Sequence, residues 1–362
     1  MGDGRGVCSE ESANGGTDVW SSSNGSADHL VVMVHGILGS IADWKFGANQ
    51  FVTELPDKVI VHCSERNMYK LTLDGVDVMG ERLAEEVIEV INRRPEIKKI
   101  SFVAHSVGGL VARYAIGRLY RPPRRKSQED STVGACEDDS RGTIYGLEAI
   151  NFVTVATPHL GSRGNKQESL GKVPFLFGVT AIEKVASLVI HWIFRRTGRH
   201  LFLTDNDGGQ PPLLQRMVDD CGDLYFLSAL RAFKRRVAYA NVGYDHIVGW
   251  RTSSIRLNSE LPKWEDSLSV KYPHIVYEEK SETKKVDQYA RDSIGEDDNC
   301  NDELEEELVT GLSRVSWERV DVSFHTSRLR FAAHSVIQVK DSFMESEGAD
   351  VIQHMIDHFL LT

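Results

Sequence analysis

Short, continuous apolar runs recur along the chain, and the first is Leu-Val-Val-Met-Val at residues 30–34. Runs of this length without alternation are typical of strands that are buried on both faces of a parallel sheet. Each run ends in a turn that contains glycine, histidine or another polar residue. The predicted strands cover residues 30–34, 58–62, 99–104, 149–156, 236–242 and 314–324.

Stretches with apolar residues at helical spacing separate these runs. In residues 81–92, for example, Leu83, Val87 and Val90 fall on one helix face, and prolines end the helices predicted at 81–92 and 107–120. A further helix is predicted at 348–361. The alternation of strand and helix predicts an α/β fold with a mostly parallel central sheet flanked by helices.

Three stretches interrupt the rhythm inside one large domain that spans residues 28–362. Residues 160–234 carry helical apolar patterns without a clear strand, which predicts a helical cap inserted between two core strands. The other two stretches are dominated by charged residues, as surface inserts often are, and we expect both to be disordered. The expected segments are a disordered tail at 1–27, charged insert 121–141, helical cap 160–234 and acidic insert 278–307.

Within the predicted cap, residues 173–194 form an apolar segment about as long as a membrane span. The segment contains Glu183, Lys184 and His191, which would be costly at the centre of a bilayer. We therefore expect an amphipathic helix, either buried or facing lipid, that covers an acyl-chain pocket. Peripheral contact with a membrane or a lipid droplet through the cap is a further expectation.

The composition narrows the compartment and the partners. A net charge of -11 argues against nucleic-acid binding, which needs clustered Lys and Arg. The 5 cysteines are scattered and odd in number, which favours free thiols in a reducing compartment. The first residues lack the apolar core of a secretory signal. These features predict a cytoplasmic protein and leave peripheral membrane association and a plastid location open.

The turn after the strand at 99–104 carries the strongest chemical signal. It reads Ala104-His105-Ser106-Val107-Gly108-Gly109, where a buried strand reverses abruptly into a helix with serine at the apex. This is the pattern of a nucleophile elbow, whose usual form is G-x-S-x-G. Ala104 replaces the first glycine, and alanine is still small enough for the turn. A serine that merely caps the helix is the alternative.

An acyl-transfer nucleophile also needs two N–H donors for the oxyanion of its tetrahedral intermediate. One donor is expected from Val107, the residue after the nucleophile. The other is expected from the glycine-rich loop at residues 35–39, with Ile37 as the first choice and Leu38 as the second. An ordinary glycine-rich turn is the alternative for this loop.

The acid and the base are expected in the chain order serine, acid, histidine. Asp245 follows the strand at 236–242 within a few residues, and we favour it over the acidic residues of the cap. Of the 13 histidines, His325 and His334 lie between the last strand and the last helix. We favour His334 as the base and expect His325 at the surface.

Other histidines have simpler interpretations. The side chain of His105 should point away from Ser106. His159 should line the pocket or order the entry to the cap. His354 and His358 share a helix face at a spacing that could bind zinc, but no metalloprotease glutamate lies between them, so a solvated face is expected. We therefore predict no metal and no cofactor.

With these residues in place, the chain resembles the eukaryotic family of lipase-like proteins known as putative serine esterases, which are α/β-hydrolases, and its plant-type members most closely. The resemblance implies hydrolysis of lipid or other acyl esters with Ser106, Asp245 and His334 as the triad. The motif with Ala104 in its first position is similar to the A-H-S-x-G motif of some lipases. The matching stretches are VVMVHGILGS, FVAHSVGGLVARYAIGRLY, FVTVATPHLGSRG, YANVGYDHIVGWRTS, FAAHSVIQVK and GADVIQHMIDHFLL.

The sequence thus predicts a serine hydrolase of the α/β-hydrolase fold that cleaves carboxylic esters, with lipid acyl esters as its expected substrates. Two alternatives stay open. The same fold could transfer the acyl group to another acceptor or cleave a thioester. A catalytically silent α/β-hydrolase could instead act as a binding protein through its charged inserts.

Overall fold

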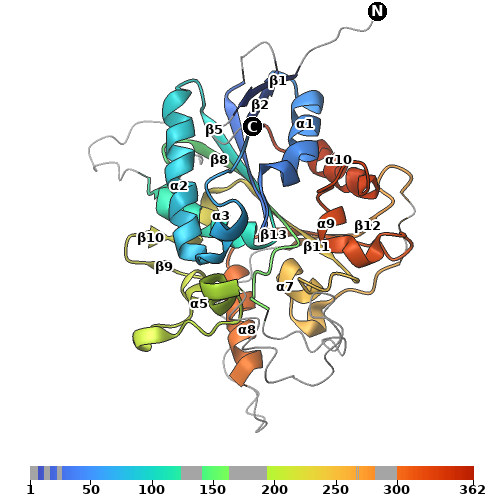
Figure 1. The fold of residues 1–362 in the computed structure, drawn as a ribbon. Coiled ribbons are helices and arrows are strands. Elements are labelled where there is room, and N and C mark those ends of the chain that lie inside the picture. The colour runs from blue at the N-terminus through green and yellow to red at the C-terminus, as the bar shows by residue number, and fades with distance from the viewer. Residues whose placement is uncertain are drawn as a thin grey trace, which may run out of the picture.

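A nine-stranded sheet forms the centre of the protein, in the strand order β1-β2-β4-β3-β5-β8-β11-β13-β12 (Figure 1). The six strands from β4 to β13 in this order are parallel, and β1, β2 and β12 are antiparallel to their neighbours. Their bounds are β1 Val7–Glu11, β2 Thr17–Ser22, β3 His29–Val34, β4 Val59–Cys63, β5 Lys99–His105, β8 Glu148–Val155, β11 Arg235–Asn241, β12 Ile275–Ser281 and β13 Trp317–Val322.

The structure is a computed structural model, and it describes residues 7–11, 17–22, 27–123, 141–162, 194–265, 267, 269–281 and 300–362. Its longer helices are α1 Lys45–Glu54, α2 Val76–Arg93, α3 Val107–Leu119, α6 Phe226–Ala232, α8 Cys300–Leu312 and α10 Ala349–Asp357. Its shorter elements are α5 Leu213–Arg216, α7 Trp250–Ser254, α9 Ala333–Val336 and the small strands β6 Tyr120–Arg121, β7 Thr143–Ile144, β9 Asp220–Cys221 and β10 Leu224–Tyr225.

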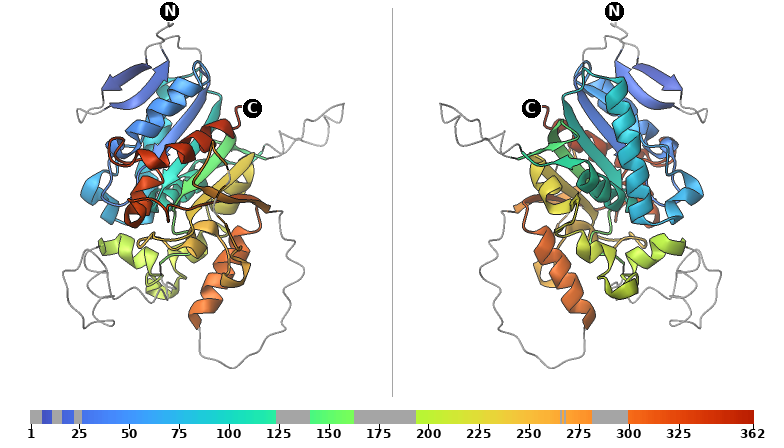
Figure 2. Two further views of the ribbon diagram at one scale, coloured as in Figure 1. Left: turned by 90° about the vertical axis from the view of Figure 1, so that its right-hand side faces the viewer. Right: turned by 90° about the vertical axis from the view of Figure 1, so that its left-hand side faces the viewer.

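Helices cover both faces of the sheet, so two apolar cores form. In β3, Leu30 and Val32 point into the core under α2, α3 and α6. Val31 and Met33 point into the opposite core, under α1 and α10. Figure 2 shows the two helical layers from both sides of the sheet. This two-sided burial is the reason that the strands are continuously apolar rather than alternating.

The predicted α/β-hydrolase fold is confirmed: every strand and helix predicted for the core lies where expected, within a few residues at each end. The sequence analysis missed α1 and β12. The charged insert 121–141 lies outside the described residues except at its ends, and so does the apolar segment 173–194 except its last residue. In the described part of the chain, no helix has the length and apolar character to cross a bilayer.

The expectation of disorder is wrong for parts of two segments. Strands β1 and β2 lie in the segment 1–27. They are held by backbone pairing of β1 with β2 and of β2 with β4, which needs no apolar run. Helix α8 begins in the last part of the acidic insert 278–307. Its acidic residues are interspersed with leucines at helical spacing that form one apolar face. Leu304 packs against the core, and Leu308 and Leu312 are fully buried.

A buried histidine at the start of β3 gives a prediction about stability. Burial, with the charge of Lys99, lowers the pKa of His29 to about 4, and its Nε2 lies 2.8 Å from the Ser101 hydroxyl. Between about pH 6.5 and pH 4 the unfolded chain therefore binds a proton that the folded protein does not, and stability falls as pH falls. Because of His29, the free energy of unfolding should be about 2 kcal/mol lower at pH 5 than at pH 7.

We expect His29→Gln, which keeps a polar group toward Ser101, to remove the part of the pH-dependent loss of stability that is due to His29. Urea unfolding of both proteins at pH 7 and pH 5 measures it. An equal loss of stability in both would contradict the assignment.

Candidate active site

Ser106 lies at the apex of a sharp turn between β5 and α3. The strand ends at His105 and the helix begins at Val107, so a single residue makes the reversal. Ser106 has φ 54° and ψ -134°, a conformation that costs a non-glycine residue about 1–3 kcal/mol. Its backbone N–H is held by the carbonyl oxygen of Val155 at 2.9 Å. The turn is therefore a strained elbow that presents the hydroxyl beyond the end of the sheet.

Two glycines leave room for this elbow. A Cβ atom at Gly36 would lie 2.8 Å from the Cβ of Ser106, so a side chain there would displace the nucleophile. A Cβ at Gly108 would lie 2.4 Å from the carbonyl oxygen of His35. The loop after β3 and the first turn of α3 can thus approach Ser106 because both positions lack a side chain. The methyl group of Ala104 is accommodated in full burial.

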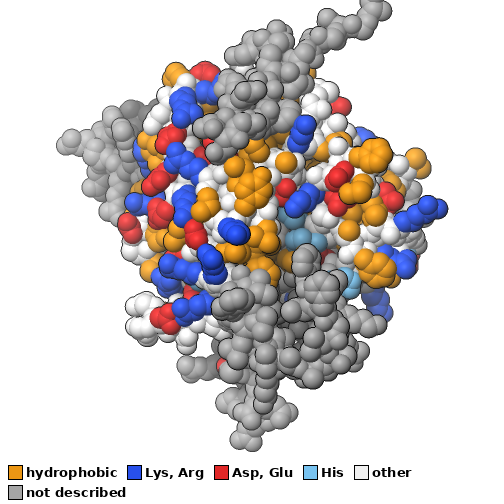
Figure 3. Space-filling model, viewed as in Figure 1, with side chains coloured by type: hydrophobic (Ala, Val, Ile, Leu, Met, Phe, Trp, Pro, Cys, Tyr) orange, Lys and Arg blue, Asp and Glu red, His pale blue; other side chains and the backbone are white. Residues whose placement is uncertain are grey.

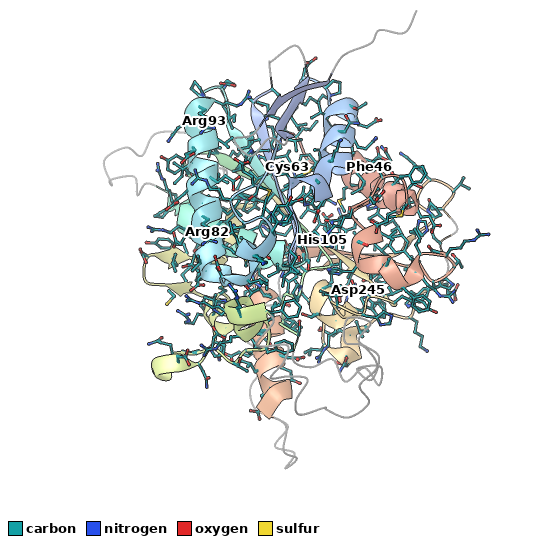
Figure 4. All side chains as sticks on the ribbon, in the orientation of Figure 1. Phe46, Cys63, Arg82, Arg93, His105 and Asp245 are labelled. Carbon is teal, nitrogen blue, oxygen red and sulfur yellow. The ribbon has the colours of Figure 1, made fainter. Side chains whose placement is uncertain are left out.

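Three predicted side chains meet at this end of the sheet, although they are far apart in the chain. The Nε2 atom of His334 lies 3.0 Å from the hydroxyl oxygen of Ser106. The Nδ1 atom of His334 lies 2.9 Å from Oδ2 of Asp245. The tautomer that satisfies both contacts carries its proton on Nδ1, which leaves Nε2 free to accept the serine proton. Figure 4 labels Asp245 and His105 at this position, below the centre of the sheet.

Asp245 is held as a carboxylate by four donors. Besides His334, the Asn241 side chain donates to its Oδ2 at 2.9 Å, and the N–H groups of Ile247 and Val248 donate to its Oδ1 at 3.0 and 2.8 Å. Burial alone would raise the pKa of Asp245. The charge and hydrogen bond of His334, with the other donors, outweigh burial and hold that pKa below its ordinary value. Asn241 was not singled out in the sequence analysis.

The neighbour of the nucleophile also contributes. His105 Nε2 lies 2.7 Å from the backbone carbonyl oxygen of His334, and the two rings lie 4.6 Å apart. Burial, and then the charge of His334, keep the pKa of His105 well below its ordinary value. A neutral His105 that donates through Nε2–H therefore supports the backbone that carries His334. The sequence analysis placed this side chain away from Ser106 and gave it no role.

The loop after β3 distinguishes between the two oxyanion donors considered for it. The Leu38 N–H donates to the Thr72 hydroxyl at 2.8 Å, so this group is already used. The Gly36 carbonyl oxygen accepts from the Gly39 N–H at 3.1 Å and lies 3.0 Å from His35 Nδ1. Because the peptide bond between Gly36 and Ile37 is trans, the Ile37 N–H points in the direction opposite to the Gly36 carbonyl.

In the described part of the chain, the Ile37 N–H has no hydrogen-bond acceptor. Val107 is the first residue of α3, where an N–H has no partner within the helix. Ile37 and Val107 are therefore the donors available to an oxyanion at Ser106.

His159, His325 and His354 have no described contact with Ser106, His334 or Asp245. His325 is half-buried and contacts Ser323. His159 is fully buried, with Nε2 2.9 Å from the Thr154 hydroxyl. The expectation of a solvated His354 is wrong: it is fully buried, with Nδ1 2.8 Å from the Tyr239 hydroxyl, because α10 turns this face to the sheet. Among the residues whose placement is described, no group of three or more His, Cys, Asp or Glu could hold a metal ion.

Taken together, a strained serine hydroxyl, an imidazole, a buried carboxylate and two N–H groups form one contiguous site. This set of groups can activate a hydroxyl as a nucleophile and stabilise negative charge on the carbonyl oxygen that it attacks.

Comparison with known proteins points in the same direction. Residues 24–255 match the family described as "Putative serine esterase (DUF676)". The chain is 28% identical over 250 residues to "Putative lipase C4A8.10" of Schizosaccharomyces pombe, which covers 66% of this chain and 28% of that protein. It is 30% identical over 236 residues to "Putative lipase ROG1" of Saccharomyces cerevisiae, which covers 63% of this chain and 28% of that protein. The chain thus spans less than a third of these curated relatives.

Two solved structures are also similar. The mature form of the Bacillus licheniformis lipase BlEst2 has a TM-score of 0.33 at 17% identity, covering 59% of this chain and 66% of that one. The Pyrococcus furiosus esterase Pf2001 has a TM-score of 0.34 at 13% identity, covering 68% of this chain and 74% of that one.

Proposed function

Because the chain belongs to the putative serine esterase family (DUF676), we propose that it is a serine hydrolase that cleaves carboxylic esters, with lipid acyl esters as substrates. The observation that carries the proposal is the unbroken contact series from Ser106 through His334 to Asp245, with spacings of 3.0 and 2.9 Å. The activity proposed is that of this chain alone. A closer relationship to plant members and a cytoplasmic or plastid location stay predictions.

The proposed reaction proceeds through an acyl-enzyme. The Ser106 oxygen attacks the ester carbonyl carbon, its proton passes to His334 Nε2, and the carbonyl electron pair moves to the oxygen. The N–H groups of Ile37 and Val107 bind that oxyanion. Collapse of the intermediate expels the alcohol, which takes the proton from His334. Water, activated by the same imidazole, then releases the acid and restores Ser106. Asp245 stabilises the imidazolium in both halves.

The surface around Ser106 supports a lipid substrate. Six large apolar side chains stay exposed there, and we call them the apolar rim. Residues Leu38, Tyr69 and Leu71 belong to the oxyanion side, where the Tyr69 N–H donates to the Gly39 carbonyl. The other three lie on the Asp245 and His334 side, where the rings of Tyr244 and Phe331 are 5.5 Å apart. The rim comprises Leu38, Tyr69, Leu71, Tyr244, Ile247 and Phe331.

Cations lie among the members of the rim. Lys70 is exposed between Tyr69 and Leu71, and the Arg330 guanidinium lies 5.1 Å from the Phe331 ring centre. Figure 3 shows histidine on this face between groups of hydrophobic side chains, with basic and acidic side chains beside it. In a protein of net charge -11, such a combination favours a lipid surface with anionic headgroups. This extends the expectation of peripheral membrane contact from the cap to the rim.

The test of the proposed function is a panel of acyl esters. Short soluble esters, mono- and diacylglycerols and phospholipids are incubated with the full chain, and Ser106→Ala serves as the blank. Release of free acid by the wild type alone supports the proposal. Hydrolysis of short esters without any lipid would refute the lipid substrate while leaving the esterase intact. Product analysis with added alcohols or thiols detects acyl transfer, and a fluorophosphonate that labels nothing would favour a silent binding protein.

We expect Phe331→Ser to reduce activity on acylglycerols in vesicles with anionic lipid about threefold to tenfold, because it removes the most exposed ring of the rim, at 65% exposure. Activity on a short soluble ester should stay unchanged. Leu360→Ser is the control, since Leu360 is 38% exposed at the C-terminus, at the opposite end of the sheet. Equal losses on soluble and vesicle substrates would show that the ring acts on the catalytic site instead of the lipid surface.

A further inference from the structure

The turn that carries the oxyanion donor is held from outside by one hydroxyl group. The Thr72 hydroxyl accepts the Leu38 N–H at 2.8 Å and donates to the Tyr69 carbonyl at 2.6 Å. Both contacts fix its orientation, and Thr72 is only 1% exposed. Thr72 does not touch Ser106, His334 or Asp245 in any described contact. Its direct link to the oxyanion loop is the bond to Leu38, and a second, indirect link runs through Tyr69, whose N–H donates to the Gly39 carbonyl.

The Leu38 contact determines which turn the loop adopts. The Gly39 N–H donates to the Gly36 carbonyl, so Ile37 and Leu38 are the two central residues of this turn. Leu38 has φ 54°, which a leucine rarely adopts. Turns with positive and with negative φ at this position differ by a flip of the central peptide, whose N–H here is that of Leu38. The bond to Thr72 therefore stabilises the peptide orientation that gives Leu38 its unfavourable positive φ. This peptide directly follows the Ile37 N–H.

A second threonine connects Thr72 to the predicted cap. Residues 194–201 are helical and follow the undescribed part of the cap. Within them, the Thr197 hydroxyl donates to the Thr72 carbonyl at 2.7 Å and accepts the Gly75 N–H at 3.0 Å. One turn later, His200 Nδ1 accepts the Val76 N–H at 3.0 Å. Thr197 and His200 are both buried, so the helix is docked on the segment between Thr72 and α2.

We propose that Thr72 is a positioning residue for the oxyanion loop and that docking of the 194–201 helix, through Thr197, sets how well the loop is formed. The proposal rests on the proposed function for its catalytic consequence. The cap then regulates the rate of the chemical step and is more than a cover for the acyl chain. Its parts are the contacts Thr197–Thr72 and Thr72–Leu38, which we call the cap relay.

The experiment compares the full-length wild type with Thr72→Val, Thr72→Ser, Thr197→Val and the double valine variant. Valine keeps the shape of threonine and removes its hydroxyl. Thr204→Val, in the same cap segment, is the matched control because Thr204 bonds to Arg199 and has no described contact with Thr72. Readouts are kcat and KM on a short soluble ester, inhibition by a trifluoromethyl ketone, and the exchange rate of the Leu38 amide by NMR.

The ketone isolates the oxyanion hole. Ser106 adds to its carbonyl carbon, the serine proton moves to His334, and the resulting hemiketal oxyanion needs the same two N–H donors. We expect Thr72→Val to lower kcat about tenfold with KM unchanged, and to raise the ketone inhibition constant by the same factor. The loss is smaller than the 10²–10³ typical of deleting an oxyanion donor, because the Ile37 N–H is displaced rather than removed. Thr72→Ser should restore activity to within about threefold.

The contribution of the 194–201 helix is tested by changing Thr197. Thr197→Val should lower kcat about threefold and speed Leu38 amide exchange, and the double variant should be no worse than Thr72→Val alone, because both act through one contact. Multiplying effects in the double variant would overturn the relay. An unchanged kcat and unchanged Leu38 exchange in Thr72→Val would overturn the positioning role.

Failure of the relay and failure of the proposed function give different results. If the wild type hydrolyses no ester, the proposed function fails, and Leu38 exchange alone decides the relay. If the wild type is active and the threonine variants match it, only the relay fails.

Discussion

Replacing Ser106 by alanine should lower kcat for ester hydrolysis by about 10⁶-fold and abolish labelling by a fluorophosphonate. The hydroxyl is the only group within hydrogen-bond distance of His334 Nε2 in the described contacts, so no other oxygen is placed to take over the attack. Loss of the nucleophile in a triad typically removes about 10⁶ in kcat and leaves the smaller contribution of the oxyanion hole and of substrate binding. Activity should be measured on a soluble ester to separate chemistry from lipid docking.

The fold should survive this change. Alanine keeps the Cβ that packs against Gly36, and the Ser106 N–H to Val155 bond involves only backbone. Ser313→Ala is the matched control, because Ser313 is a buried serine whose hydroxyl makes no hydrogen bond within the described chain. That variant should be labelled and active like the wild type. Labelling that persists in Ser106→Ala would identify another nucleophile and remove the basis of the proposed mechanism.

The parts of the site that could be predicted from the sequence are those fixed by local chemistry. Ser106 is recognisable because a buried strand, a serine and glycines follow one another within a few residues. The core strands are recognisable because burial on both faces makes them continuously apolar, as in β3. Asp245 and His334 are reached through the chain order of the fold, since each follows a strand at the end where the elbow lies.

Other parts depend on contacts between residues far apart in the chain. The preference for Ile37 over Leu38 as a donor rests on a hydroxyl 34 residues away in the chain. Neither the sequence at 35–39 nor the sequence around Thr72 indicates that Thr72 will contact Leu38. The contact of His105 with the His334 carbonyl spans 229 residues. Asn241 is a similar case. Nothing in the sequence distinguishes an asparagine at a strand end as a partner of Asp245, and only the folded structure brings the two side chains together. The edge strand β1 and its neighbour β2 were not predicted for a related reason, because their pairing partners are backbone groups.

Asp245→Asn should lower kcat by about 10⁴-fold without unfolding the protein. The N–H groups of Ile247 and Val248 would keep the amide oxygen at the Oδ1 position, so the amide nitrogen would take the place of Oδ2. There it would donate to His334 Nδ1 and shift the imidazole proton to Nε2. An Nε2–H cannot accept the proton of Ser106. In a well-characterised triad the equivalent exchange costs about 10⁴.

A charge-matched variant separates the contact from the charge. The swapped pair Asn241→Asp with Asp245→Asn keeps one carboxylate in the same buried cluster, because the two side chains lie 2.9 Å apart. No described contact joins Asn241 to the His334 ring, so the relocated carboxylate would leave the imidazole in the wrong tautomer. We therefore expect the swapped variant to stay as inactive as Asp245→Asn, with pre-steady-state acylation as the measurement. Recovery to within tenfold of the wild type would mean that nearby negative charge suffices, and the role of Asp245 would then be stabilisation of the imidazolium alone.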